Sequence, residues 1–183
     1  MIRRILAVGT ALAVLATATM IASAESATVT VTAGTLTLTT NPVALPGITL
    51  SGVDQTTATT AGDDVFNVAD GRGSGAGYNV TIDTTDFTAG GSTIDTGTGA
   101  FDVSLQDADI VVLGGNATKP TSSVTALTDI PESPAAALKV LSAAVSAGQG
   151  SYDWKPVFSL TILAQADAGS YTATITLTVA TGP

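Results

Sequence analysis

Apolar and hydroxyl residues alternate with a period of two along several short stretches of the chain. The alternation is longest near the C-terminus, where residues 171–179 place aromatic or aliphatic side chains on one side and mostly threonine on the other. One apolar and one polar face is typical of a half-buried antiparallel strand. Shorter stretches with the same pattern predict further strands at 28–32, 35–39, 66–68, 78–82 and 101–105.

Turn-forming residues separate these stretches. Clusters of Gly, Asp, Asn and Pro stand between the predicted strands, where tight connections are needed. Many short strands with turn signals between them favour two packed sheets over a helical or α/β arrangement. The pattern therefore predicts an all-β fold, a single antiparallel β-sandwich.

Residues 134–146 are the exception to the strand pattern. Ser133 stands where a helix N-cap would lie, Pro134 occupies the first helical position, and Gly148 follows the end. Three apolar residues would share one helical face: Leu138, Leu141 and Val145. The pattern favours one short helix near 134–146, and a strand beginning at Lys139 is the alternative.

The first 24 residues predict a secretory signal peptide. Arg3-Arg4 forms a basic start, an uncharged apolar run extends to Ile21, and Ala22-Ser23-Ala24 provides the small residues of a cleavage site. An uncleaved membrane anchor is the alternative, but it needs roughly 20 apolar residues, and this run is shorter. Cleavage would leave residues 25–183 as one domain, in which no second apolar stretch is long enough to span a membrane.

The net charge limits which partners the protein can bind, and the lack of cysteine limits how its fold can be stabilised. After cleavage, four cations remain against 15 carboxylates, a net charge of −11. Such a field repels phosphate backbones, so nucleic acid is not expected as a partner. The chain has no cysteine, so an exported domain of this sequence would depend on apolar packing and sheet hydrogen bonds rather than disulfides.

No residue pattern predicts a catalytic or metal site. The chain lacks histidine as well as cysteine, which removes the commonest general base and the usual zinc ligands. Paired carboxylates such as Asp63-Asp64, Asp83 with Asp86, and Asp107 with Asp109 are interpreted as turn formers and surface charges. No complete calcium-binding loop is present. We therefore expect no enzymatic activity, no cofactor and no metal.

A glycine-rich stretch carries the first part of a family resemblance. Residues 65–80 read VFNVADGRGSGAGYNV, in which the glycines lead into a strand rather than into the helix that a phosphate-binding loop requires. The stretch resembles the region around the first W-x-L motif of bacterial WxL-domain surface proteins. Tyr78 and Val80 stand at the tryptophan and leucine positions of that motif.

A second stretch resembles the other motif of the same family. Phe158 and Leu160 stand at its tryptophan and leucine positions, and Ala168-Gly169-Ser170-Tyr171 matches the A-G-x-Y that follows. Both signature tryptophans are thus replaced by another aromatic residue. The one tryptophan of the chain, Trp154, lies just before this motif. Two interpretations of Trp154 are open, an exposed residue that stacks on sugars and a residue of the sandwich core.

The resemblance implies both a fold and a function. Members of the family are secreted, resemble immunoglobulin-like sandwiches, and associate noncovalently with peptidoglycan, often together with sibling surface proteins. It therefore implies a non-enzymatic protein of the extracellular cell surface or cell wall. Its motif residues become candidates for wall or partner binding, either by contact or through packing in the core: Tyr78, Val80, Trp154, Phe158 and Leu160.

The N-terminal strand pattern supports an alternative function. Residues 25–32 read Glu-Ser-Ala-Thr-Val-Thr-Val-Thr, small and β-branched residues with a single charge and no proline, so they could complete the sheet edge of a neighbouring molecule. Repetition of that contact would produce a self-assembling filament or surface layer. The other interpretation is that this segment forms the first strand of its own sandwich.

The signal-peptide prediction can be tested on the exported protein. If the cleavage site is placed correctly, N-terminal sequencing of the mature product should begin at Glu25. A mature product that still carries Arg3-Arg4 would contradict it.

Overall fold

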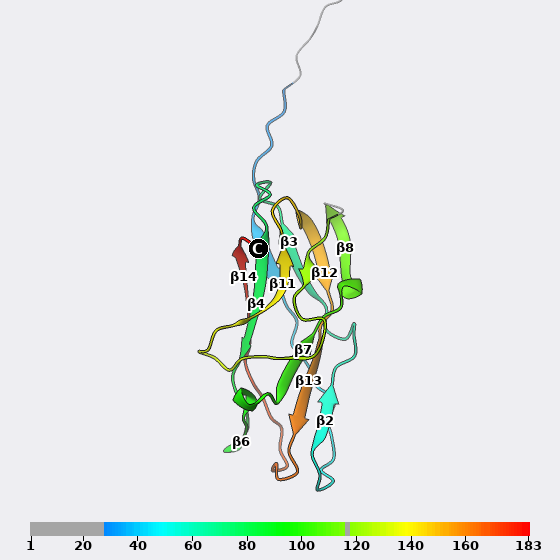
Figure 1. The fold of residues 1–183 in the computed structure, drawn as a ribbon, viewed down its shortest axis with the longest axis vertical. Helices are drawn as coiled ribbons and strands as arrows, with labels where there is room; N and C mark the ends of the chain where they lie inside the picture. The colour runs from blue at the N-terminus through cyan, green and yellow to red at the C-terminus, as the bar shows by residue number, and fades with distance from the viewer. Residues whose placement is uncertain (1–27, 116–117) are drawn as a thin grey trace, which may run out of the picture. The chain divides into compact units, whose positions relative to one another are not determined.

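The structure of the chain is a computed structural model that describes residues 28–115 and 118–183 (Figure 1). The predicted signal peptide over 1–24 lies outside the described residues. Residues Thr32–Pro183 form one compact unit, and the chain before them belongs to a separate unit. The described residues contain no helix that is long and apolar enough to cross a membrane.

Three four-stranded sheets and one hairpin make up the compact unit, and every strand pairing in them is antiparallel. The first sheet, in spatial order, contains β1 (Leu36–Thr39), β3 (Phe66–Asp70), β12 (Gly150–Trp154) and β8 (Ile110–Gly115). The second contains β10 (Thr128–Asp129), β7 (Phe101–Ser104), β13 (Val157–Ile162) and β2 (Gln55–Ala58).

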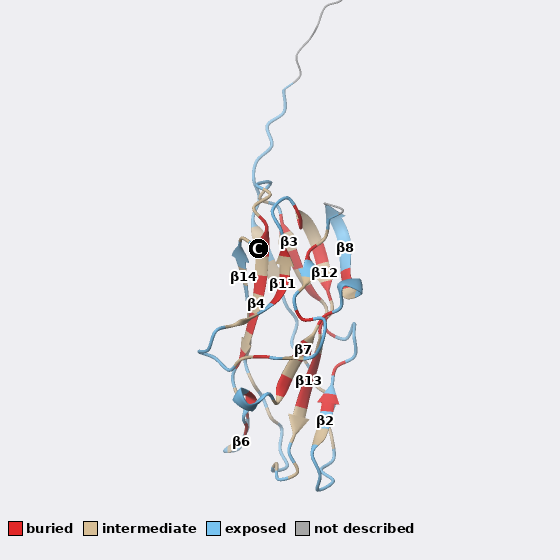
Figure 2. Ribbon diagram, in the orientation of Figure 1, coloured by how far each residue is buried: buried red, intermediate tan, exposed pale blue. Residues whose placement is uncertain are grey.

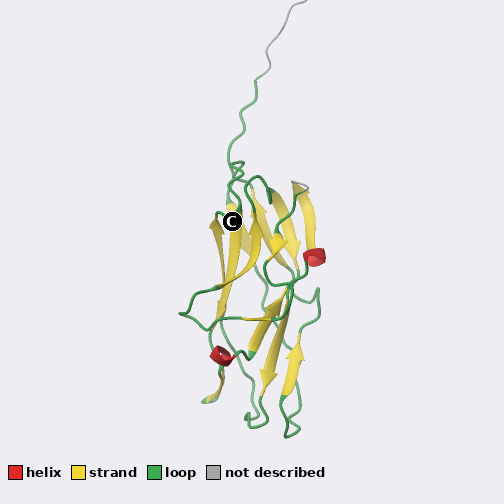
Figure 3. Cartoon of the chain, in the orientation of Figure 1, coloured by secondary structure: helices red, strands yellow, loops and turns green. Residues whose placement is uncertain are grey.

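The third sheet and the hairpin complete the architecture. The third sheet, in spatial order, contains β14 (Ile175–Thr181), β4 (Tyr78–Thr84), β11 (Leu138–Ala143) and β9 (Thr121–Ser122). The hairpin pairs β5 (Phe87–Ala89) with β6 (Ser92–Ile94). The helical content of the described residues is two single 3₁₀ turns, η1 (Thr96–Thr98) and η2 (Asp107–Asp109) (Figure 3).

The sheets pack around one core, as the predicted alternation requires. Along β3 and β4 every second side chain is buried, and the side chains between them are partly exposed (Figure 2). All three sheets and the hairpin contribute to a single cluster of buried apolar residues. The predicted antiparallel β-sandwich is therefore confirmed, and so are strands at 66–68, 78–82 and 101–104.

The short helix predicted near 134–146 is wrong. The alternative of a strand beginning at Lys139 is confirmed to within one residue, because residues 138–143 form β11, which pairs with β4 on one side and β9 on the other. Val140, Leu141 and Ala143 are buried there, with a register shift between Lys139 and Leu141 that turns two neighbouring residues toward the core. Burial between two strands outweighs the helical capping signals, because intrinsic propensity is the weaker effect.

The strand predicted at 28–32 is also wrong. Residues 28–32 form no strand, and Val29 and Val31 are 86% and 88% exposed. The first strand of the fold is β1, which begins at Leu36. The interpretation that the N-terminal segment is the first strand of its own domain is therefore wrong. At the other end, the last strand begins at Ile175 rather than near residue 171.

Candidate functional site

The motif residues all lie in the core. Tyr78 and Val80 belong to β4, Trp154 ends β12, and Phe158 and Leu160 belong to β13. None of them is more than 3% exposed. The interpretation of Trp154 as an exposed sugar-stacking residue is therefore wrong, and the core interpretation is confirmed for Trp154.

Phe158 of the second motif is central to a row of aromatic rings. Its ring centroid lies 6.2 Å from that of Phe66 and 5.8 Å from that of Phe101. Phe66 in turn packs edge-on against Trp154 at 5.0 Å, and Phe101 against Phe87 at 5.0 Å. Aromatic pairs of this kind contribute about 0.5–1.5 kcal/mol each beyond the area they bury. The row contains all four phenylalanines and the one tryptophan of the chain.

Tyr78 of the first motif packs separately, against a glycine. A Cβ at Gly148 would lie 2.9 Å from Cε1 of Tyr78 and 2.4 Å from Cβ of Ala143, so no other residue fits beside the ring. The Tyr78 hydroxyl is buried and has no hydrogen-bond partner among the described residues. Burial raises the pKa of Tyr78, and the phenol is therefore neutral at physiological pH. Its position indicates a packing role.

An arginine clamp holds the glycine-rich loop that precedes Tyr78. The Arg72 guanidinium donates to both carboxylate oxygens of Asp70, at 2.8 and 2.9 Å, and to the carbonyl oxygen of Gly77 at 2.8 Å. It also donates to the hydroxyl of Thr181 at 2.6 Å and so ties the loop to the last strand. Gly77 itself has φ +72°, and a Cβ there would lie 2.4 Å from the carbonyl oxygen of Ala143. The loop is a tight strand connection, as predicted.

An open groove lies between the N-terminal connection and the last strand. Its larger hollow, of about 760 Å³, is bounded by residues 43–50 and 167–175 and floored by Phe87, Phe101 and Leu160. Its smaller hollow, of about 440 Å³, is bounded by residues 40–43 and by Ile175 and Leu177. The two share Val43, Ala173 and Ile175, so they form one groove.

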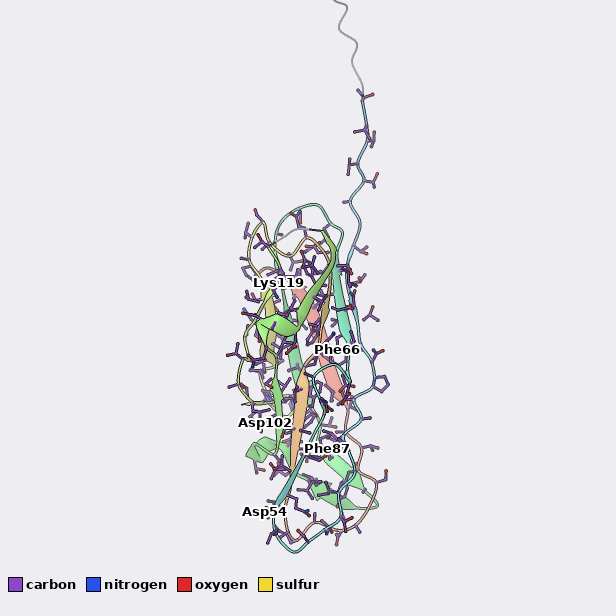
Figure 4. The ribbon with its side chains drawn as sticks, turned by 90° about the vertical axis from the view of Figure 1, so that its right-hand side faces the viewer. Asp54, Phe66, Phe87, Asp102 and Lys119 are labelled. Atoms are coloured by element: carbon purple, nitrogen blue, oxygen red, sulfur yellow. The ribbon has the colours of Figure 1, made fainter. Side chains whose placement is uncertain are left out.

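The aromatic row reaches the floor of both hollows. Phe66 lines the smaller hollow, and Phe87 and Phe101 line the larger one; Figure 4 labels Phe66 and Phe87. No sequence pattern pointed to this groove, because residues 40–50 carry neither alternation nor a motif. The groove is marked by the partly buried apolar residues of its walls, among them Val43, Ile175 and Leu177.

The interpretation of the paired carboxylates as turn formers and surface charges is confirmed for Asp63, which accepts a hydrogen bond from the amide of Thr60 at 2.8 Å. Asp107 instead accepts from the amide of the distant Ser122 at 2.7 Å, and Asp64 is buried rather than on the surface. The one carboxylate cluster among the described residues whose oxygens approach within 4.8 Å joins Asp86, Asp95 and Glu132.

That cluster has the oxygen ligands a hard cation would use. Asp86 already accepts from the amide of Thr96, and Asp95 from the amide of Gly97, both at 2.8 Å. These hydrogen bonds give the two aspartates a structural role, so we assign no ion to the cluster.

The environments of Asp70 and Asp102 shift the pKa values of these two carboxylates in opposite directions. Hydrogen bonds from Arg72 hold the pKa of Asp70 below its usual value. Burial raises the pKa of Asp102, which pairs across the strands with Asp129. Burial, and then repulsion from Asp102, raises the pKa of Asp129 as well. At neutral pH the Asp70 charge therefore stabilises the fold, whereas the Asp102 charge destabilises it.

Removing each charge should have opposite effects on the free energy of unfolding. At pH 7 the Asp70→Asn variant should lose about 1.5–3 kcal/mol, the size of a hydrogen bond to a charged group. This difference in the free energy of unfolding should have its full size at pH values above the ordinary aspartate pKa. It should vanish as the pH falls below the lowered pKa of Asp70. Asp102→Asn, the matched control, should be neutral or stabilising at pH 7. Urea unfolding between pH 3 and 7 measures both, and equal losses in the two variants would contradict the assignment.

Comparison with known proteins identifies the family. A family model described as "WxL domain surface cell wall-binding" matches residues 28–183, which include every described residue. No curated protein and no solved structure matched the chain. The family is one of the cell surface, and the matched range includes both stretches on which the resemblance was based, so the predicted family is confirmed. The chain belongs to the family of WxL-domain surface proteins that bind the cell wall.

Proposed function

We propose that the chain is a non-enzymatic surface protein that is held noncovalently on peptidoglycan or on sibling surface proteins. The observation that carries this proposal is the family match over residues 28–183, because it covers the whole compact unit rather than one part of it. The absence of histidine and cysteine from the sequence supports a binding rather than a catalytic role.

The motif residues would support binding through the fold. With exposed fractions of 3% or less, Tyr78, Trp154 and Phe158 present no face that a glycan strand could stack on. They instead position the strands and loops whose outer surfaces meet the wall. This accounts for the replacement of both signature tryptophans, since another aromatic residue can fill the same space in the core.

The net negative charge of the protein makes wall binding dependent on ionic strength. The mature chain carries a net charge of −11, and an anionic wall would repel it over roughly 10 Å at 0.1 M salt. Binding should therefore be weak at low ionic strength and should improve with added salt or divalent cations. An interaction governed by attraction between opposite charges would show the reverse trend.

Co-sedimentation with purified peptidoglycan tests the proposal. Residues 25–183 should pellet with the insoluble wall and remain in solution without it. Tyr78→Phe should bind like the wild type, because it removes a buried hydroxyl that has no partner among the described residues and keeps the ring. Trp154→Phe removes an indole N–H that likewise has no partner among those residues, and it leaves a smaller aromatic ring, so it should lose some stability but still bind while folded.

Two results would each contradict one part of the proposal, the first its peptidoglycan arm and the second the role of the motif residues within the core. Failure of the folded wild type to sediment at any salt concentration would exclude direct peptidoglycan binding. A folded Trp154→Phe variant that no longer sediments would show that the indole itself contacts the wall.

A further inference from the structure

The groove is flanked by polypeptide whose backbone groups have no sheet partner. β14 pairs with β4 along one edge, and no strand of the described residues is paired with its other edge, which approaches β1 over part of its length and borders the smaller hollow at Ile175 and Leu177. Across the groove, residues 40–50 belong to no strand and make no backbone–backbone hydrogen bond within the described chain. On that wall the carbonyl oxygen of Pro46 accepts from the hydroxyl of Thr57, so the edge for an added strand is the unpaired one of β14.

The floor of the groove consists of core side chains rather than surface ones. Phe66, Phe87 and Leu160 belong to the buried cluster and yet line the two hollows. The inward side chains of β14, Ile175 and Leu177, remain only partly buried beside them. The floor itself is buried, with exposed fractions of 0–8%, so the apolar surface open to solvent is that of the partly buried walls. An apolar side chain inserted there would be removed from water and would contact wall residues such as Val43, Ile175 and Leu177.

The N-terminal segment has the matching pattern. Residues 28–32 read Thr-Val-Thr-Val-Thr, so both valines fall on one face of an extended chain and the threonines on the other. The two valines are the most exposed large apolar side chains of the described residues. β14 alternates in the same way, with Ile175 and Leu177 inward and threonine outward. A strand laid beside it in register would place its valines over the floor.

Charge also favours a contact through these two surfaces. No charged residue lies between Glu25 and Asp54, a span that contains both the N-terminal segment and one wall of the groove. Asp167 is the one charged residue that lines the larger hollow, and none lines the smaller. Two copies that each carry −11 repel one another over most of their surfaces. Contact through the uncharged segment and groove avoids that repulsion.

We propose that residues 28–32 of one copy dock in the groove of a second copy as an added strand beside β14. The segment and the groove are different surfaces of the same chain, so the contact is heterologous and repeats from copy to copy. The result is a chain of subunits at the cell surface. Self-association of this kind does not depend on wall binding, and it can be measured in the absence of peptidoglycan.

The edge of β8 is the competing acceptor and fits less well. Val111, Val112 and Leu113 are exposed there at 39%, 42% and 59%. Three consecutive apolar residues point to both faces of the sheet, whereas the N-terminal segment is apolar on one face only. β8 therefore provides a matched control site for the experiment.

Cysteine cross-linking tests the contact directly, since the chain has no cysteine of its own. Mature Val31→Cys protein is mixed with Ala173→Cys protein under mild oxidation, in parallel with a mixture of Val31→Cys and Val112→Cys. The groove pair should give about tenfold more mixed disulfide than the β8 pair, which corresponds to ~1.4 kcal/mol of preference. An equal yield from the two mixtures would overturn the groove as the acceptor.

Light scattering over a range of concentrations tests the assembly. The wild type should grow in mass with concentration, and deletion of residues 25–31 should leave a folded monomer because the compact unit remains whole. Val29→Ser with Val31→Ser should also abolish assembly. Thr28→Ser with Thr30→Ser, on the opposite face, should not.

Three results would overturn the proposal. The first is a wild type that stays monomeric at high concentration. The second is a chain carrying both Val31→Cys and Ala173→Cys that closes its disulfide within a monomer, because the segment would then occupy its own groove. The third is protection of the Ala173→Cys thiol by soluble peptidoglycan fragments in a protein that never assembles, because the groove would then be a wall site. In each of these cases, co-sedimentation of the monomeric protein with peptidoglycan would still support the separate proposal that the protein binds the wall.

Discussion

The packing of Phe158 between Phe66 and Phe101 is the interaction on which the rest of the structure depends. Phe66 belongs to the first sheet and Phe101 to the second, so the ring of Phe158 joins the two. The chain has no disulfide to hold these sheets together. Removal of a core aromatic side chain typically costs about 3–5 kcal/mol, a large part of the stability of a domain of this size. The second family motif therefore lies where the fold is most sensitive.

The loop before the first motif has a different role, because it lets the chain reverse direction between β3 and β4. Three glycines of the loop adopt positive φ: Gly73, Gly75 and Gly77. Arg72 then fixes this flexible loop by binding the buried carboxylate of Asp70 and reaching the last strand at Thr181. Glycine allows the turn at the cost of conformational freedom, and the ion pair offsets part of that cost. Both motifs thus stabilise the scaffold that presents the wall-binding surface.

Local patterns predicted the parts of the fold in which one face of a strand meets the core. β3 and β4 could be recognised because alternation and burial coincide along them. For β11 the sequence left a helix and a strand open, because Ser133 and Pro134 favour a helix locally and only pairing with β4 and β9 decides the outcome. The candidate residues of the site were found through the motifs, but their burial depends on how the sheets pack. The groove was not predictable, because it arises where residues 40–50 fail to pair with β14.

The central claim is that the motif residues support wall binding from within the core, and Trp154 reports on this directly. It is the one indole of the chain and is 1% exposed. Quenching of its fluorescence by iodide should be measured with and without soluble peptidoglycan fragments, at concentrations where binding is established. The account predicts weak quenching in the free protein and no change on binding. Strong quenching in the free protein that the fragments suppress would contradict it, because the indole would then lie at the binding surface.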